Sequence, residues 1–277
     1  MCVSGGVAIG TAGLGDGSPG WLSRTQYDFL LFDCQHSDLE LKQLAPIIAT
    51  MAPGSCPIVR VGENVADQIC YALDAGAKGV VIPMVNTAQQ AEDAVSRCKY
   101  HPKGVRSNAG ARGGLGVGFG SDPVGYREYM DFFNACAATQ PGRLLCRCAH
   151  HYAADNGFLV CRNVLVCPMV ETAEAVENID AICAVDGVDV VLIGPSDLSI
   201  NLDFPVDYTN PGYIQVLKTI SASCNKHGVV PGVYFQPPGL EPDALVEMGF
   251  RFFSLGVYHS QAIAGIDNTL ANIRAKL

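Results

Sequence analysis

The chain has little positive charge and no long apolar segment. Among its 277 residues, 18 Lys and Arg are outnumbered by 27 Asp and Glu, which gives a formal net charge of -9 at pH 7. Nucleic acids and anionic membranes attract clustered positive charge, so this balance argues against both as the main partner. No apolar run reaches the roughly 20 residues that a membrane-spanning helix needs. Basic groups that bind an anionic substrate must therefore be a local feature.

Two further signals are absent. The N-terminus lacks the basic segment that precedes the apolar core of a secretory signal, so we expect a cytoplasmic protein. The glycine-rich dinucleotide fingerprint does not occur between a predicted strand and a predicted helix. Cysteine, by contrast, is abundant, with 12 residues that often lie in apolar runs. We interpret them as reduced thiols, because reduced Cys packs as a small core residue and a reducing compartment disfavours disulfides.

Short apolar runs alternate with helical patterns along most of the chain. The strand candidates are residues 28–34, 57–61, 79–85, 164–170, 188–194, 229–235 and 250–256, with a weaker eighth near 6–10. The helix candidates are 87–98, 172–185, 212–226, 242–248 and 260–277. Strands buried on both faces and joined by helices are typical of a parallel sheet. The sequence therefore predicts an α/β protein, with one (β/α)8 TIM barrel domain over residues 1–277.

One supersecondary unit occurs twice. Residues 79–95 and 164–179 each read as an apolar run, Pro-Met-Val, one polar residue, Thr-Ala and a helical pattern. The polar residue is Asn86 in the first copy and Glu171 in the second. Repetition of βα units is what barrels are built from, and the exchange of an amide for a carboxylate marks the second copy as chemically different.

The segment 134–163 breaks this rhythm and is predicted to be an irregular insert. It concentrates Cys and His residues, namely Cys136, Cys146, Cys148, His150, His151 and Cys161. Thiolates and imidazoles are zinc ligands, but the spacing differs from the usual zinc patterns. Three interpretations are open: a zinc-binding interaction loop, a plain inserted loop and an artefact of the gene prediction.

In a barrel the reacting groups lie where strands end, at the C-terminal face. The polar residues near these ends are Asp33, His36, Arg60, Glu171, Ser196 and Asp197, while Asp74 ends the helix after the strand that carries Arg60. A carboxylate after a strand is often only a helix N-cap, and a single histidine is often structural. An arginine inside an apolar strand needs a partner or an open cavity.

Together these residues would form a coherent site. Two carboxylates on neighbouring strands suit a hard divalent cation such as Mg²⁺ or Mn²⁺, with Co²⁺ as a further option. An arginine can hold a carboxylate or an enolate oxygen, and a His–Asp pair supplies a base. These groups are what is needed to form and protonate an enolate next to a carbonyl.

Several motifs resemble the HpcH/HpaI aldolase/citrate lyase family. They include "LLFDCQHSDLE", "PIVRV", the pattern E-T-x-x-x-x-x-N from Glu171 and the pattern G-P-S-D-L from Gly194. The resemblance covers residues 19–277 apart from the insert. It implies a phosphoenolpyruvate/pyruvate-type (β/α)8 barrel and metal-dependent class II pyruvate aldolases, with relatives such as macrophomate synthase.

The resemblance also implies roles for individual residues. Glu171 and Asp197 match the metal ligands, and Arg60 matches the arginine that contacts pyruvate or its enolate. His36, supported by Asp33 and Asp74, matches the base. The backbone of Pro195, Ser196 and Asp197 would hold the pyruvate carboxylate.

Three features depart from the family pattern. The histidine follows Cys34-Gln35 where a Gly-Glu pair is common, and Met169 stands where a glutamine is common. A thioether cannot donate to a substrate carboxylate, so substrate preference is expected to differ. The first βα unit also looks shortened, which would leave an incomplete barrel with an open edge.

The resulting hypothesis is a carbon–carbon lyase. It would cleave a 4-hydroxy-2-oxo acid to pyruvate and an aldehyde through a metal-bound pyruvate enolate. The alternatives are an oxaloacetate decarboxylase similar to macrophomate synthase and a catalytically defective paralogue that keeps the scaffold. The expected partners are a small 2-oxo acid and, as the resemblance implies, further copies of the chain in a homo-oligomer whose last helix packs on or swaps with a neighbour.

Overall fold

The computed structural model describes residues 6–12, 18–52, 54–108 and 164–274. The predicted insert at 134–163 and its Cys and His residues lie outside the described residues. Within the described part, eight parallel strands close into a barrel in sequence order. The strands are β1 (Ala8–Ala12), β2 (Phe29–Asp33), β3 (Cys56–Arg60), β4 (Gly79–Ile82), β5 (Leu165–Val170), β6 (Val190–Ile193), β7 (Val230–Val233) and β8 (Phe252–Val257). The predicted TIM barrel is therefore confirmed.

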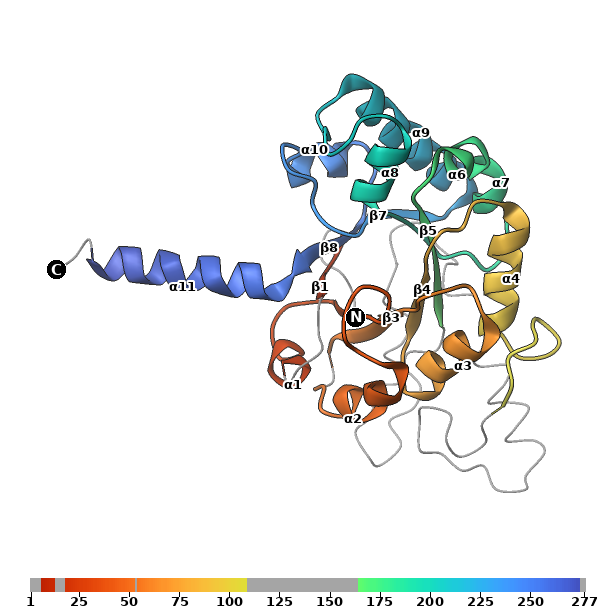
Figure 1. The fold of residues 1–277 in the computed structure, drawn as a ribbon, viewed down its shortest axis with the longest axis horizontal. Helices are drawn as coiled ribbons and strands as arrows, with labels where there is room; N and C mark the ends of the chain where they lie inside the picture. Colours follow the sequence, from red (N-terminus) through yellow and green to blue (C-terminus); the bar gives the residue numbers. More distant parts are fainter. Residues whose placement is uncertain (1–5, 13–17, 53, 109–163, 275–277) are drawn as a thin grey trace.

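Helices surround most of this barrel (Figure 1). They are α1 (Pro19–Leu22), α2 (Leu44–Ile48), α3 (Ala66–Asp74), α4 (Ala88–Cys98), α6 (Ala173–Glu177), α7 (Ile179–Cys183), α8 (Pro195–Asn201), α9 (Pro211–His227), α10 (Pro242–Glu247) and α11 (Tyr258–Arg274), with a 3₁₀ turn, η1, at Leu41–Gln43. The single helix expected over 172–185 is two short helices, because the chain leaves helical geometry at Asn178.

The first βα unit is short but the barrel is closed. Helix α1 has only four residues, as the sequence suggested, yet β1 pairs with both β2 and β8. The expectation of an open edge is therefore wrong. Gly10 explains how so short a strand fits, because a Cβ at this position would lie 2.4 Å from the ring of Phe29. That ring stacks on Phe252 with centroids 4.2 Å apart and fills the interior of the barrel.

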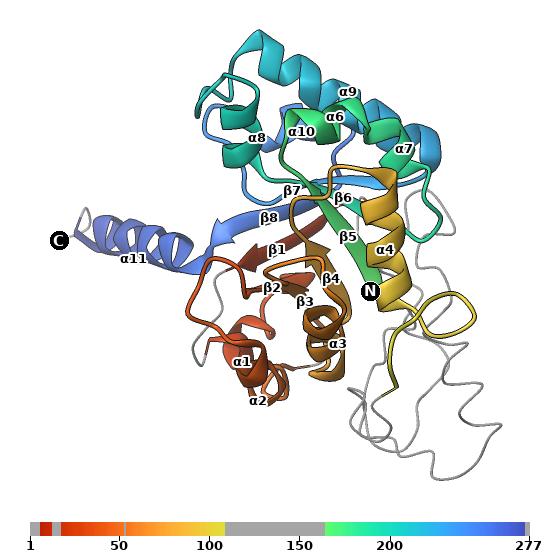
Figure 2. The ribbon, with the colours of Figure 1, turned by 45° about the vertical axis from the view of Figure 1, so that its right-hand side comes forward.

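Helix α11 points away from the barrel in both ribbon views (Figures 1 and 2). Only Tyr258 at its start is buried. The side chain of Gln261 fixes this end, accepting a hydrogen bond from the hydroxyl of Tyr27 and donating one to the carbonyl of Leu255. No helix in the described residues has both the length and the apolar character of a membrane span.

Candidate active site

Polar side chains converge at the C-terminal ends of the strands, as the barrel geometry requires. Asp33 and Arg60 are the last residues of β2 and β3 and face each other in register. Glu171 follows β5, Gly194 follows β6 and Tyr234 follows β7. These five residues belong to five strands whose ends ring one mouth of the barrel.

Arg60 and Asp33 form a buried, two-point ion pair. The Nε of Arg60 donates to Oδ1 of Asp33 at 2.8 Å and its Nη2 donates to Oδ2 at 2.5 Å. Burial alone would raise the pKa of Asp33, but the hydrogen bond and charge of Arg60 outweigh it and lower that pKa. Burial likewise works to lower the pKa of Arg60, and its contacts with Asp33 raise it overall. Both groups therefore stay charged, and the remaining guanidinium donors are available for an anion.

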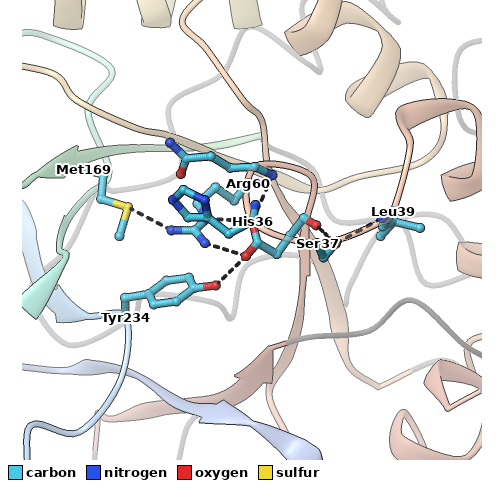
Figure 3. A network of polar contacts seen from close by, with 8 residues as sticks. His36, Ser37, Leu39, Arg60, Met169 and Tyr234 are labelled. Carbon is cyan, nitrogen blue, oxygen red and sulfur yellow. Dashed lines mark hydrogen bonds and ion pairs between the residues drawn. The ribbon is translucent and has the colours of Figure 1, made fainter. Parts of the chain in front are cut away.

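Tyr234 completes this pair and was missed by the sequence analysis. Its hydroxyl donates to Oδ2 of Asp33 at 3.1 Å, and its ring lies 4.2 Å from the guanidinium carbon of Arg60 (Figure 3). On the other flank, the sulfur of Met169 is 4.0 Å from Nη1 of Arg60. A signal for Tyr234 was present, because it lies at the end of a predicted strand, the same criterion that selected Arg60.

The loop after β2 is held by Asp33 and carries His36. The Oδ1 of Asp33 accepts the backbone N–H groups of Gln35 at 3.0 Å and of His36 at 3.3 Å. His36 itself is exposed at the mouth. The structure does not show the predicted support of the imidazole of His36 by Asp33. The carboxylate of Asp33 binds Arg60, and within the described residues no hydrogen bond joins it to the imidazole. The base role of His36 stays a prediction.

Asp74 belongs to a separate contact. Its Oδ1 accepts a hydrogen bond from Nη2 of Arg106 at 2.9 Å, and the guanidinium of Arg106 lies over the ring of Tyr100. The thiol of Cys70, one turn earlier in α3, is 3.6 Å from Oδ2 of Asp74. An ion pair that joins α3 to residues 100–106 therefore explains the carboxylate at this helix end. Among the described residues, no contact joins Asp74 to His36, which it was predicted to support.

Glu171 is a buried carboxylate with an unused oxygen. It is 3% exposed, and its Oε1 has no hydrogen-bond partner among the described residues. Burial, followed by the charge of nearby Asp197, raises the pKa of Glu171 to about 7, although Arg60 acts in the opposite direction. Gly194 makes room for this side chain, because a Cβ there would lie 2.9 Å from the Cγ of Glu171.

These features fit a divalent cation held by Glu171 and Asp197. An acceptor oxygen that is buried without a donor is costly unless a cation or solvent occupies the space in front of it. Asp197 lies in the first turn of α8, which follows β6, the neighbour of β5, and its side chain is exposed. The described residues contain no group of three or more Cys, His, Asp or Glu side chains that could hold a metal. A Mg²⁺ ion held by two carboxylates usually keeps water or substrate oxygens as its other ligands.

The predicted carboxylate-binding backbone lies next to Asp197. Pro195 and Ser196 begin α8, whose first N–H groups have no acceptor within the helix. The hydroxyl of Ser196 lies 3.4 Å from the hydroxyl of Tyr208. The structure thus brings Ser196 and Asp197 to the same mouth as Glu171, and their role in binding substrate stays a prediction.

The repeated unit now shows why Asn86 and Glu171 differ. The Oδ1 of Asn86 accepts a hydrogen bond from the hydroxyl of Thr172 at 2.6 Å, and its carbonyl accepts one from Asn178 at 2.9 Å. The same hydroxyl of Thr172 caps α6 by accepting the N–H of Ala175. Asn86 therefore anchors the residues that follow Glu171 through its acceptor oxygens, whereas Glu171 presents its carboxylate to the mouth.

Comparison with known proteins agrees with this architecture. The family model for HpcH/HpaI aldolase/citrate lyase matches residues 20–264. The hydroxypyruvate/pyruvate aldolase of Rhizorhabdus wittichii is 30% identical over 92% of this chain and 88% of its own length. The 2-keto-3-deoxy-L-rhamnonate aldolase of Klebsiella pneumoniae is also 30% identical, with the same coverage. Among solved structures, macrophomate synthase aligns with 98% of this chain and 85% of its own, with a TM-score of 0.72 and 23% identity.

Proposed function

This chain belongs to the HpcH/HpaI aldolase/citrate lyase family and is a carbon–carbon lyase, and on that premise we propose that it cleaves a 4-hydroxy-2-oxo acid into pyruvate and an aldehyde with the help of a divalent cation. The observation that carries the proposal is the orphaned, buried oxygen of Glu171 at the same barrel mouth as Arg60. Two relatives are named as aldolases of compounds that contain a 2-oxo acid.

Each residue at the mouth has a separate role in the proposed reaction. The free N–H groups of Arg60 bind the 2-oxo acid and neutralise the negative charge that develops on its oxo oxygen. His36 accepts the proton of the C4 hydroxyl, directly or through water, as the C3–C4 bond breaks and its electron pair moves toward the oxo group. The resulting enolate then takes a proton at C3, from the protonated His36 through water, to give pyruvate. The backbone of residues 195–197 holds the substrate carboxylate.

Glu171 and Asp197 would hold the cation next to this position. A bound Mg²⁺ or Mn²⁺ supplies Lewis acidity, which makes a carbonyl oxygen a better carrier of negative charge. The chain's own contribution is to keep both carboxylates close together despite their repulsion. The missing Cβ at Gly194 leaves room for the side chain of Glu171 next to α8, whose first turn carries Asp197.

The direct test is an assay of pyruvate release from 4-hydroxy-2-oxo acids, with oxaloacetate in parallel. Purified protein dialysed against EDTA is expected to lose activity, and Mg²⁺ or Mn²⁺ is expected to restore it, with Co²⁺ as a further candidate. Release from hydroxy-oxo acids supports the aldolase, whereas release from oxaloacetate alone would favour the decarboxylase. Activity that chelator leaves unchanged would remove the metal from the mechanism.

We also propose that the protein assembles with copies of itself through α11. The helix presents four exposed apolar side chains on one stripe, at spacings of three, four and three residues: Ile263, Ile266, Leu270 and Ile273. Such a stripe is normally covered. At the base of the helix lies a groove of about 500 Å³ whose lining includes Ile9, Trp21 and Tyr27. Both this groove and the stripe on α11 are mainly apolar, so the α11 of a second copy would suit the groove.

Replacing Ile266 by aspartate is expected to dissociate this assembly. A charge in the centre of the stripe would be buried without a partner, which costs several kcal/mol. Light scattering coupled to gel filtration should give a smaller particle for Ile266→Asp than for the wild type. Asn268→Asp, on the same helix but off the stripe, should keep the wild-type mass. A wild type that is monomeric at every concentration would contradict the proposal.

A further inference from the structure

The contacts of Arg60 leave part of its guanidinium unused. The side chain is 5% exposed and has five N–H donors, of which Asp33 takes one on Nε and one on Nη2. Within the described residues, Nη1 has only the sulfur of Met169, at 4.0 Å, as a hydrogen-bond neighbour, and a thioether is a weak acceptor. The orientation of the guanidinium plane therefore determines where its remaining N–H donors point.

Tyr234, the residue after β7, contacts both members of this ion pair from the other side of the barrel. Its hydroxyl donates to Oδ2 of Asp33, the same oxygen that accepts from Nη2 of Arg60. Its ring covers one face of the guanidinium at 4.2 Å, and Figure 3 shows the guanidinium between Tyr234 and Met169. One side chain thus restrains both the carboxylate that orients the arginine and the face of the arginine itself.

The environment of Tyr234 suits a permanent donor. Burial raises the pKa of its hydroxyl, so the group stays protonated throughout the ordinary pH range. A cation over an aromatic face gains more when both are removed from water. Among the described residues, the carboxylate of Asp33 has no side-chain donors other than Arg60 and Tyr234, so the hydroxyl is the only side-chain contact to it that steadies the pair without adding charge.

We propose that Tyr234 is a positioning residue for the lyase reaction: it fixes the orientation of Arg60 so that the unused donors meet the 2-oxo acid. This inference rests on the proposed function, because it assigns Arg60 to the substrate. The hydroxyl and the ring act separately. The hydroxyl sets the position of Asp33, and the ring sets the plane of the guanidinium.

Two variants separate these contributions. Tyr234→Phe removes the hydrogen bond and keeps the ring, and Tyr234→Leu removes both. We expect the dissociation constant for pyruvate, measured by calorimetry with saturating Mg²⁺, to rise about 5-fold in the first variant and about 50-fold in the second. KM should rise in the same order, with a smaller change in kcat, because the group acts on binding geometry. Tyr71→Phe, which alters an exposed tyrosine on α3, is the matched control.

The outcomes are distinguishable. A graded loss of pyruvate affinity at unchanged far-ultraviolet circular dichroism supports the inference. Affinity and KM within twofold of the wild type in both variants, or a loss confined to thermal stability, would overturn it and make Tyr234 a packing residue. Wild-type protein that neither binds pyruvate nor cleaves any 2-oxo acid would overturn the proposed function, and this inference with it.

Discussion

Replacing Glu171 by glutamine is expected to lower kcat/KM for pyruvate release about a thousandfold. A neutral amide is a poor ligand for a hard divalent cation, and losing several kcal/mol of charge stabilisation corresponds to that factor. Calorimetric titration with Mn²⁺ should show the loss of binding directly. Glu174→Gln, three residues later on the exposed face of α6, should leave both measurements unchanged. If Glu171→Gln kept wild-type activity and Mn²⁺ affinity, Glu171 would not be a metal ligand.

The same variant should stabilise the metal-free protein, in a pH-dependent way. Burial raises the pKa of Glu171 to about 7 from its ordinary value of 4.5. Between these values the folded state binds a proton that the unfolded state has lost, so this group makes stability fall as pH rises. Above pH 7 the full penalty for a buried carboxylate is present, on the order of 3 kcal/mol.

Urea unfolding in EDTA measures this effect. At pH 8, Glu171→Gln should have the higher free energy of unfolding, by about 2 kcal/mol, because an amide carries no charge to desolvate. At pH 4.5 the wild-type carboxyl is protonated as well, so the two proteins should be nearly equal. A difference that does not depend on pH would mean that the carboxyl is already protonated or well solvated in the folded state.

Replacing Arg60 by methionine is expected to damage both stability and activity. The substitution leaves the carboxylate of Asp33 buried without its cation, which costs about 3–5 kcal/mol in comparable pairs. It also removes the proposed anion contact for the substrate, so kcat/KM should fall by at least about a hundredfold. Lys226→Met is the control, because its ion pair with Asp180 is exposed and should contribute little to stability.

A double variant separates the two effects. Arg60→Met combined with Asp33→Leu replaces the ion pair by apolar side chains, and most of the lost free energy of unfolding should return. Activity should not return, because no guanidinium remains at the mouth. Chemical denaturation and the pyruvate assay on the wild type and three variants complete the double-mutant cycle. Recovery of activity in the double variant would show that Arg60 acts only through folding.

The positions of the candidate site residues could be predicted because the ends of strands can be recognised in the sequence. Arg60 interrupts an apolar run and Glu171 ends one, and closure of a barrel brings all such ends to one mouth. The contacts between these residues could not be predicted from the sequence. Whether Asp33 faces His36 or Arg60 depends on the register between β2 and β3, which pairs Asp33 with Arg60. A pattern along one strand carries no information on that register.

Other differences have equally local causes. The weak strand near the N-terminus closes the barrel because Gly10 admits the ring of Phe29, a contact between residues 19 positions apart. The helix expected over 172–185 breaks at Asn178, whose side chain donates to the carbonyl of Asn86 in the earlier copy of the repeated unit. The amphipathic pattern of α11 correctly predicted a helix, but the same pattern also suits a helix that packs on its own barrel.

Gly194 limits how this enzyme could be redesigned. Any library that randomises the mouth to accept new aldehydes would include this position, since it lies between the two candidate metal ligands. Every side chain introduced there would occupy the volume of Glu171. Diversity is better directed to Met169, whose flexible thioether lies next to Nη1 of Arg60 and occupies none of the volume that Gly194 leaves to Glu171.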